Sequence, residues 1–371
     1  VVVPAENAPE AAVVRGVEVY GVRSLRECAE FLSGRQALTP AEARLEAWMQ
    51  DPSRHDVDFS EVKGQLHVKR ALEVAAAGGH NVLMIGPPGS GKTLLSKRLP
   101  TILPPLTLEE AIETTKIHSI AGLLKPRQAL VAARPFRSPH HTISDAGLIG
   151  GTAEPRPGEV CLAHNGVLFL DELPEFKRNA LEVMRQPLED GRVTIARAAS
   201  TMTFPCRFML VAAMNPTPTG SADSRSSPAQ VQKYLNKISS PLLDRIDIHV
   251  EVPALKYEEM RHGANGETSA DIRNRVVGAR KIQSERFKAA KKIRSNAQMG
   301  PKEVKEHCAL DAECEMLLRA AMQELSLSAR GHDRILKVAR TIADLAGSEK
   351  IAPDHLGEAV QYRSLDRTYW V

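Results

Sequence analysis

A glycine-rich segment in the first third of the chain constrains its fold more than any other feature. The segment reads Gly86-Pro87-Pro88-Gly89-Ser90-Gly91-Lys92-Thr93 and matches G-x-x-x-x-G-K-[ST] at every fixed position. An apolar run at 81–85 precedes it, and a helical pattern at 94–99 follows it. Glycines allow backbone N–H groups to converge on a phosphate, and the following helix points its positive end at the anion. The sequence therefore predicts a strand–loop–helix unit that binds ATP, with Lys92 at the β- and γ-phosphates and Thr93 at Mg²⁺.

Other apolar runs indicate what surrounds this unit. They read GVLFL at 166–170, RFMLVAAM at 207–214 and IDIHVEVP at 246–253. Continuous Val, Ile and Leu without polar alternation fit strands covered on both faces, as in a parallel sheet with flanking helices. From about residue 257 helical patterns replace them, at 269–297, 301–324, 328–346 and 353–364. We therefore expect an α/β domain with a parallel sheet at 57–255, followed by an all-helical lid domain at 256–371.

Polar side chains stand at the ends of two of these runs. Asp171 and Glu172 follow the run at 166–170, and Asn215 follows the run at 207–214. The carboxyl ends of the strands in an α/β sheet form the edge at which ligands bind. We expect Asp171 to hold Mg²⁺, Glu172 to polarise the attacking water and Asn215 to orient that water. The alternative is that these residues are ordinary strand ends, but their place after the glycine-rich loop favours the functional interpretation.

Composition narrows the remaining choices. Lys and Arg number 49 against 45 Asp and Glu, so a net charge of +4 gives no general affinity for nucleic acid, and any basic surface must be local. Aromatic residues make up 4%, which argues against a base-stacking surface. No apolar run is long enough to cross a bilayer. The cysteines are scattered without a Cys-x-x-Cys pair, which argues against zinc and favours a reducing, cytoplasmic location. They are Cys28, Cys161, Cys206, Cys308 and Cys314.

The opening of the chain has a different pattern. Two β-branched runs enclose a polar turn, and a helical stretch from Ser24 to Phe31 follows. Such a unit is too small to bury a core alone, so we interpret 1–34 as the end of a domain whose beginning precedes Val1. The polar, proline-containing segment 35–56 is expected to be a linker.

Several segments together resemble a known family. They are GPPGSGKT, GVLFLDE, VAAMNPTPTG, SSPLLDRIDIHVEVP and SARGHDRILKVARTIADL, and PFRSPHHTISDAGLIGG makes the resemblance specific. These segments are similar to the AAA+ ATPases related to the magnesium-chelatase ATPase subunit, and more narrowly to the ComM (YifB) group. The resemblance covers about 57–371. Residues 1–34 resemble the end of a Lon-type protease domain, which precedes the ATPase in this group.

The resemblance implies a role for each residue that matches a family motif. Lys92 and Thr93 correspond to the P-loop ligands of ATP and Mg²⁺. Asp171 and Glu172 correspond to metal binding and water activation, and Asn215 corresponds to sensor 1.

Arginines complete this set. Arg245, in LLDRID, corresponds to the arginine finger, and Arg330, in SARGHDRIL, to the sensor-2 arginine, with Arg334 as the other candidate. A guanidinium pairs with phosphate oxygens through its planar fork, and a finger from a neighbour can raise turnover on the order of a thousandfold. Hydrolysis would then depend on a ring, and the resemblance implies a homohexamer. The alternative for Arg245 is a surface ion pair with Asp244 or Asp247.

Two basic segments between these motifs are candidates for contacts with DNA. One lies at 134–158, and the other is a hairpin-like pair of strands at about 190–204. Their candidate residues are Arg134, Arg137, His140, His141, Arg156, Arg192 and Arg197. In the wider clade, inserts at these places are pore loops, and six copies in a ring multiply each charge, so phosphates are bound without reading sequence. The alternatives are that the arginines fill a subunit interface and that the histidines pack the loop.

These observations lead to an expectation for the whole chain. We expect an ATP-driven hexameric DNA motor that translocates on DNA and promotes branch migration, as a helicase does, during natural transformation and recombination. It would need no membrane partner. A third basic stretch, at 279–294, is either a further DNA contact or a solvated helix face. The alternatives are a protein-remodelling ATPase of the magnesium-chelatase type and the motor of a Lon-like protease.

Overall fold

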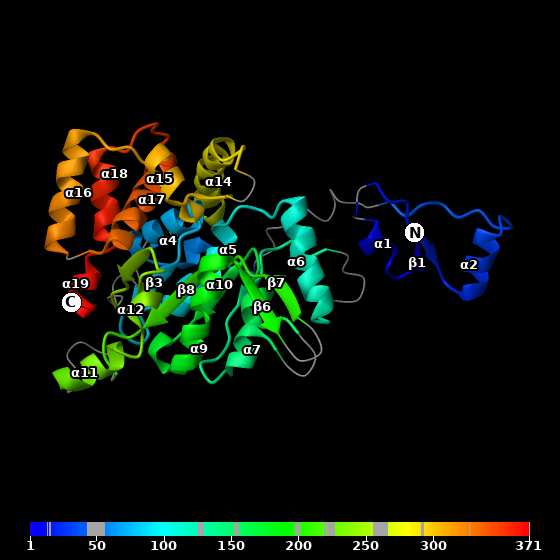
Figure 1. The fold of residues 1–371 in the computed structure, drawn as a ribbon, viewed down its shortest axis with the longest axis horizontal. Coiled ribbons are helices and arrows are strands. Elements are labelled where there is room, and N and C mark those ends of the chain that lie inside the picture. Colours follow the sequence, from blue (N-terminus) through cyan, green and yellow to red (C-terminus); the bar gives the residue numbers. More distant parts are fainter. Residues whose placement is uncertain are drawn as a thin grey trace. The chain divides into compact units, whose positions relative to one another are not determined.

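The computed structural model describes most of the chain (Figure 1). The described residues are 1–12, 14, 16–42, 56–124, 130–151, 156–196, 201–218, 220, 227–254, 266–290, 293–325 and 327–370. Arg197 and most of the predicted linker at 35–56 lie outside them. The chain forms two compact units, Val1–Arg54 with Pro105–Arg134, and His55–Pro104 with Pro135–Val371.

A parallel sheet of five strands forms the centre of the second unit, in the order β4-β5-β8-β3-β9. Two of its strands, β3 and β8, are labelled in Figure 1. The strands are β3 (Val82–Ile85), β4 (Phe136–Arg137), β5 (Val167–Leu170), β8 (Met209–Met214) and β9 (Ile248–Glu251). Every residue of β3, β5 and β8 is buried, because helices cover both faces of a parallel sheet. The predicted parallel sheet is therefore confirmed. The two-residue strand β4 is too short to leave a pattern in the sequence.

Short helices and one hairpin connect these strands. Before β5 they are η1 (Phe59–Glu61), α4 (Leu66–Gly78), α5 (Lys92–Ile102), α7 (Asp145–Ile149) and α8 (Glu159–Leu162). After β5 they are η2 (Leu173–Glu175), α9 (Arg178–Val183), α10 (Arg185–Asp190), α11 (Pro228–Leu235) and α12 (Ser240–Leu243). The hairpin pairs β6 (Arg192–Ala196) with the antiparallel strand β7 (Thr201–Pro205), as the sequence predicts.

Helices alone make up the described part of the chain after β9, as the sequence predicts. They are α14 (Ser269–Arg286), η3 (Asn296–Gln298), α15 (Pro301–His307), α16 (Ala312–Glu324), α17 (Ala329–Leu345), α18 (Pro353–Gln361) and α19 (Leu365–Trp370). The single helix expected at 301–324 is wrong. It divides because Asp311 caps a new helix, its side chain accepting a hydrogen bond from the Cys314 N–H at 2.8 Å.

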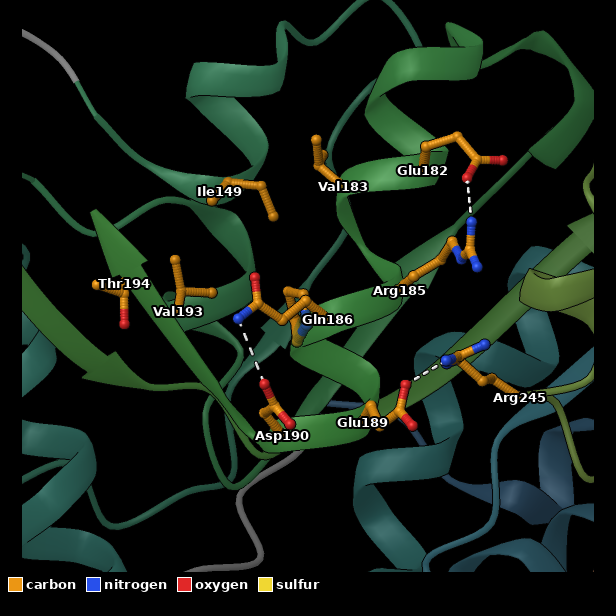
Figure 2. Close-up of a pocket in the computed structure, with 11 residues that line it drawn as sticks. Ile149, Glu182, Val183, Arg185, Gln186, Glu189, Asp190, Val193, Thr194 and Arg245 are labelled. Atoms are coloured by element: carbon orange, nitrogen blue, oxygen red, sulfur yellow. Dashed lines mark hydrogen bonds and ion pairs between the residues drawn. The ribbon is translucent and has the colours of Figure 1, made fainter. Parts of the chain in front are cut away.

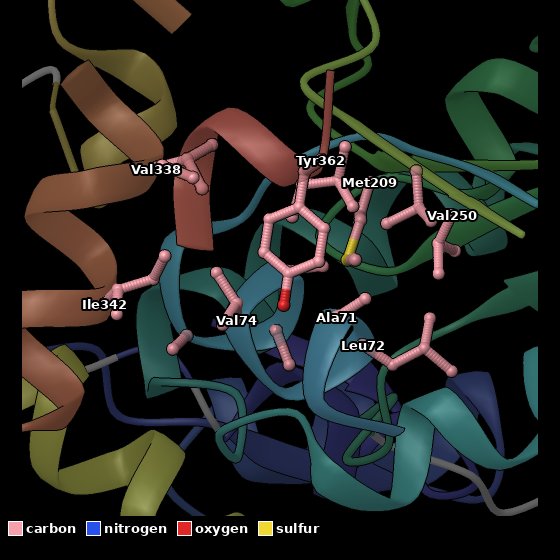
Figure 3. Packing of buried hydrophobic residues seen from close by; sticks show 14 of the residues in the cluster. Ala71, Leu72, Val74, Met209, Val250, Val338, Ile342 and Tyr362 are labelled. Carbon is pink, nitrogen blue, oxygen red and sulfur yellow. The ribbon is translucent and has the colours of Figure 1, made fainter. Parts of the chain in front are cut away.

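One hydrophobic core joins the α/β part of the second unit to its helical part. Leu72 of α4, Met209 of β8 and Val250 of β9 belong to the same buried cluster as Ile342 of α17 and Tyr362 (Figure 3). Each such side chain stabilises the fold by about 1.5–3 kcal/mol when fully buried. The helical domain is therefore packed on the nucleotide-binding sheet through shared core residues.

The first unit contains the opening of the chain and α6 (Leu108–Ile120). Strands β1 (Val2–Pro4) and β2 (Tyr20–Val22) are parallel, and a short helix, α1 (Ala8–Ala11), lies between them. The expected simple turn between two strands is therefore wrong, because parallel strands need a crossover connection. Helix α2 (Leu25–Leu32) follows as predicted. None of the helices that the structure describes in either unit is long and apolar enough to cross a membrane.

Candidate nucleotide-hydrolysis site

The glycine-rich segment leaves the carboxyl end of β3 and enters α5, as the sequence predicts. A Cβ on Gly86 would stand 2.1 Å from the carbonyl oxygen of Val252, so no larger residue fits there without moving the backbone. Gly91 caps the start of α5 with a φ of 90°, a conformation that favours glycine. The first N–H groups of α5 have no partner within the helix, so they are available to an anion held by the loop.

Lys92 lies under this loop. Its Nζ donates hydrogen bonds to the carbonyl oxygens of Gly86 (2.6 Å) and Pro87 (2.9 Å), and it is 3.2 Å from Oδ1 of Asn215. Burial lowers the pKa of Lys92, and the two carboxylates that follow β5 oppose this shift. Residues from the ends of β3 and β8 therefore meet at one point, because these neighbouring parallel strands end at the same edge of the sheet.

The two acids that follow β5 lie beside the start of α5. The Thr93 hydroxyl donates a hydrogen bond to Oδ2 of Asp171 at 2.8 Å, and Oδ1 of Asp171 accepts one from the Glu172 N–H at 3.0 Å. Glu172 has a φ of 53°, in the left-handed region that non-glycine residues seldom occupy. Its exposed side chain consequently turns away from the line of the strand. Strained residues of this kind are common at functional sites.

The structure places His141 against Glu172, which the sequence did not suggest. Nδ1 of His141 is 3.3 Å from Oε2 of Glu172, and the edge of its ring contacts Phe176, with the ring centres 6.4 Å apart. The adjacent His140 stacks on His141 and places its own Nδ1 2.9 Å from the Thr142 hydroxyl. The link follows from β4, which pairs with β5 and so brings the residues after it to the same edge. Because β4 has only two residues, the sequence carried no signal for this contact.

Gln65 is a second contributor that the sequence analysis missed. Its Nε2 donates hydrogen bonds to the carbonyl oxygens of Ser90 (2.7 Å) and Pro253 (3.0 Å), and so it ties the P-loop to the segment after β9. Its φ of 50° is again left-handed. A polar residue directly after a glycine and before a helix is too common a pattern to single this position out.

Arg245 lies at the amino ends of the parallel strands, whereas the P-loop lies at their carboxyl ends. It precedes β9, whose Ile248 pairs with Val82 at the start of the parallel strand β3, whereas the P-loop follows the end of β3. A strand of four residues spans about 13 Å, so the guanidinium cannot reach a nucleotide in its own P-loop. Its ion-pair partner is the carboxylate of Glu189 in α10, and neither of the two aspartates considered from the sequence (Figure 2).

The two sensor-2 candidates have different surroundings. Arg334 forms an ion pair with the buried Asp247, so its guanidinium already has a partner within the chain. Arg330 stands in the first turn of α17, and its charge helps to lower the pKa of Glu189, after the larger effect of Arg245. Arg330 therefore lies on the same side of the molecule as Arg245 and Glu189. Of the two sensor-2 candidates, it is the one whose described contacts leave it available to a ligand.

The predicted DNA contacts fall into two groups. In the first unit Arg134 pairs with Glu110 at 3.0 Å, and in the second Arg137 pairs with Glu159 through two contacts of 2.6 Å. The other candidates that the structure describes and places on the surface are His140, Arg156 and Arg192. Arg134 and Arg137 have their charges neutralised within the chain, so Arg192, which is exposed, is a better candidate for binding phosphates.

Part of the basic stretch at 279–294 also has structural contacts. Arg286 pairs with Asp344 at 2.5 Å, and Nη2 of Arg280 donates a hydrogen bond to the carbonyl oxygen of Ala76 at 3.0 Å. These two cations hold α14 to its neighbours, so they are not part of a free basic face.

A phosphate-binding loop after an inner strand of the sheet, β3, with acids at the end of β5, the next strand but one, is the arrangement of P-loop ATPases. The helical domain that follows β9 places this chain in their AAA+ class. Family models agree: that of magnesium chelatase, subunit ChlI, matches residues 58–260, and that of its C-terminal region matches 266–363. The chain belongs to the magnesium-chelatase family of AAA+ ATPases, within the ComM and YifB group.

Individual relatives show the same relationship. The chain is 45% identical to the Competence protein ComM of Haemophilus influenzae over 375 residues, which cover 99% of this chain and 72% of that protein. It is 43% identical to the Uncharacterized protein YifB of Escherichia coli over 374 residues, covering 99% and 71%. It is 26% identical to the Magnesium-chelatase 38 kDa subunit of Rhodobacter capsulatus over 349 residues, covering 86% and 90%.

The family implies the use of a nucleotide and Mg²⁺, and the residues present fit both. At Gly89, in the middle of the loop, no atom lies within 4 Å of the place where a Cβ would stand, so the loop backbone is open to phosphate oxygens there, and Thr93 and Asp171 offer the hard oxygen ligands that Mg²⁺ prefers. When bound, Mg²⁺ neutralises charge on the phosphates and so assists their cleavage. Lys92 would hold the β- and γ-phosphate oxygens, and Glu172 would take a proton from the attacking water, as predicted from the sequence.

Proposed function

We propose that this ATPase is the subunit of a homohexameric motor that translocates on DNA and promotes branch migration, acting in the cytoplasm on incoming DNA during natural transformation and recombination. The AAA+ fold supports ATP hydrolysis. The placement of Arg245 supports the ring, and exposed arginines near the β6–β7 hairpin support DNA as the substrate.

The separation of Arg245 from the P-loop carries the proposal. The two lie at opposite ends of the parallel strands. A single protomer therefore cannot place the Arg245 guanidinium where it would stabilise charge on the γ-phosphoryl group during cleavage. A head-to-tail neighbour supplies the missing cation, and head-to-tail contacts that close on themselves generate rings. The same reasoning extends to Arg330, which lies on the Arg245 side.

DNA is the substrate that the surface arginines favour. Arg192 is exposed at the start of the β6–β7 hairpin, and Arg156 is exposed before α8. A hexamer repeats each of them six times, and contacts with phosphates bind DNA of any sequence. The similarity to a competence protein supports the same substrate. A protein-remodelling role is the second candidate, because the chain is also similar to a magnesium-chelatase subunit over most of its length.

A subunit-mixing experiment tests the ring. Lys92→Ala should weaken nucleotide binding and Arg245→Ala should abolish hydrolysis, so each variant alone should be inactive. Mixed in equal amounts, they should regain activity, because about a quarter of the interfaces would combine an intact P-loop with an intact finger. Full activity of Arg245→Ala alone, or no recovery on mixing, would contradict a shared site.

A second experiment tests the substrate. ATP turnover of the wild type should rise with forked or four-way DNA, and Arg192→Ala combined with Arg197→Ala should remove that rise while leaving DNA-independent turnover unchanged. Stimulation by a protein and none by DNA would favour the remodelling role instead.

A further inference from the structure

The ion pair between Arg245 and Glu189 lies on the rim of a cavity of about 490 Å³ between α9, α10 and β6. Its wall is mixed: Ile149, Val183 and Val193 are apolar, whereas Glu189, Arg245 and Thr194 are polar (Figure 2). The structure that holds the candidate finger therefore also provides a concave surface beside it, at the sheet edge where a neighbouring protomer would have to bring its nucleotide.

The two partners of this ion pair are held very differently. The Arg245 side chain is 12% exposed, its Nη1 donates to the Pro241 carbonyl oxygen at 2.6 Å, and Asn81 donates to the Arg245 carbonyl oxygen at 2.9 Å. The Glu189 side chain is 62% exposed and stands in the last turn of α10, just before Gly191. Arg245 is therefore fixed in place, whereas Glu189 can rotate into solvent without disturbing the core.

A carboxylate and a phosphate compete for the same face of a guanidinium. Both present paired oxygens to its planar N–H groups, so only one of them can occupy that face at a time. Glu189 is held in its ionised form, as such a competitor must be. The hydrogen bond with Arg245 lowers the pKa of Glu189 most, and the charges of Arg245 and Arg330 lower it further. In the isolated protomer the finger is thus neutralised by a mobile side chain of the same protomer.

We propose that Glu189 is the resting counter-ion of Arg245 and that ring assembly exchanges this carboxylate for the γ-phosphate held in the neighbouring protomer. The inference rests on the proposed shared site. Glu189 acts through Arg245 and is a positioning residue. It keeps the finger from binding other anions before assembly. The ion pair between Glu189 and Arg245 must be broken when the γ-phosphate takes its place, so its loss lowers the free energy gained on assembly. A diphosphate has no γ-phosphate to take its place, so the exchange distinguishes ATP from ADP.

Glu189→Gln tests the exchange, because it keeps the shape of the side chain and removes its charge. Assembly is measured by mass photometry over a range of protein concentrations, without nucleotide, with ADP, and with the non-hydrolysable analogue AMP-PNP. With AMP-PNP, the protein concentration for half-assembly should be at least about threefold lower for Glu189→Gln than for the wild type, since the Glu189–Arg245 ion pair no longer has to be broken. It should not change with ADP or without nucleotide. Glu182→Gln is the matched control: Glu182 lines the same cavity and pairs with Arg185 at 2.8 Å, and its loss should change none of the three values.

The other outcomes overturn the inference. An equal shift in all three states would mean that Glu189 has only a structural role, and weaker assembly with AMP-PNP would mean that it supports the finger rather than competing with the phosphate. Glu189→Ala should repeat the Glu189→Gln result, which excludes an effect of the introduced amide. The Arg245→Ala variant separates the two proposals. If it hydrolyses ATP normally, the shared site is wrong. If it is inactive and Glu189→Gln shows no AMP-PNP-specific shift, only the exchange is wrong.

Discussion

A buried ion pair gives the strongest stability prediction for this protein. Asp247 is 4% exposed, forms an ion pair with Arg334 of α17, and accepts a contact from Nδ1 of His80 at 2.9 Å. Nε2 of His80 in turn lies 2.8 Å from the Thr341 hydroxyl. Burial alone would raise the pKa of Asp247, but the Arg334 and His80 charges outweigh it and hold this pKa well below its usual range. The network thus joins the start of β9 to α17.

Asp247→Asn should destabilise the second unit strongly. The substitution leaves Arg334, whose side chain is 20% exposed, without its counter-ion, and breaking a buried pair costs about 3–5 kcal/mol. The retained amide oxygen still accepts one hydrogen bond, so we expect the lower end, about 3 kcal/mol. For a unit of about 290 residues, with an unfolding entropy of about 2.1 cal/mol/K per residue, that corresponds to a fall in Tm of roughly 5 °C. Differential scanning calorimetry of the nucleotide-free protein measures it directly.

Asp244→Asn provides the control, since Asp244 is partly exposed three residues earlier in the chain. Its Tm should change by no more than about 2 °C. The pH dependence adds a second check. The folded pKa of Asp247 is lowered, so its stabilisation is complete above the unfolded pKa of about 4 and is lost as pH falls further. The Tm difference between wild type and Asp247→Asn should hold from pH 5 to 8 and shrink below pH 4. Equal, small Tm changes for the two variants would refute the reasoning.

Three further predictions concern the site and its support. Gly86→Ala should abolish nucleotide binding in a fluorescent-nucleotide titration, because the added Cβ meets the carbonyl oxygen of Val252 at 2.1 Å; retained affinity would contradict the close approach. His141→Ala should lower turnover roughly fivefold at unchanged nucleotide affinity, by removing a polar contact of about 1 kcal/mol to Glu172, while the neighbouring His140→Ala should not. Burial, with Arg363 nearby, lowers the pKa of His249, so stability should fall as pH drops below about 6.5 and the unfolded chain takes up the proton; His249→Gln should flatten that slope.

Much of the fold could be predicted because its signals are local. The unbroken apolar runs of β3, β5 and β8 indicate strands buried on both faces, and the structure buries every residue of them. The run at 246–253, which contains β9, and the helical patterns after it were equally visible. Short or interrupted elements were not: β4 has two residues, and the division between α15 and α16 depends on a single cap at Asp311.

The candidate site divides in the same way. Lys92, Thr93 and the glycines could be predicted because they are adjacent in the chain and the chemistry of a phosphate cradle dictates their spacing. The meeting of Asp171 with Thr93 could be expected from the rule that strand ends share an edge. The roles of Asn215, Arg245 and Arg330 remain predictions, which the mixing and substitution experiments address.

The order of residues along the chain thus determined the P-loop, the buried strands and the acids that follow one of them, since covalent neighbours and hydrophobic periodicity act over a few residues. Only the tertiary structure decided which distant side chains meet. It placed His141 beside Glu172 through the pairing of β4 with β5, and it paired Arg245 with Glu189 rather than with a nearby aspartate. Such contacts depend on strand order and helix packing, which no short stretch of sequence encodes.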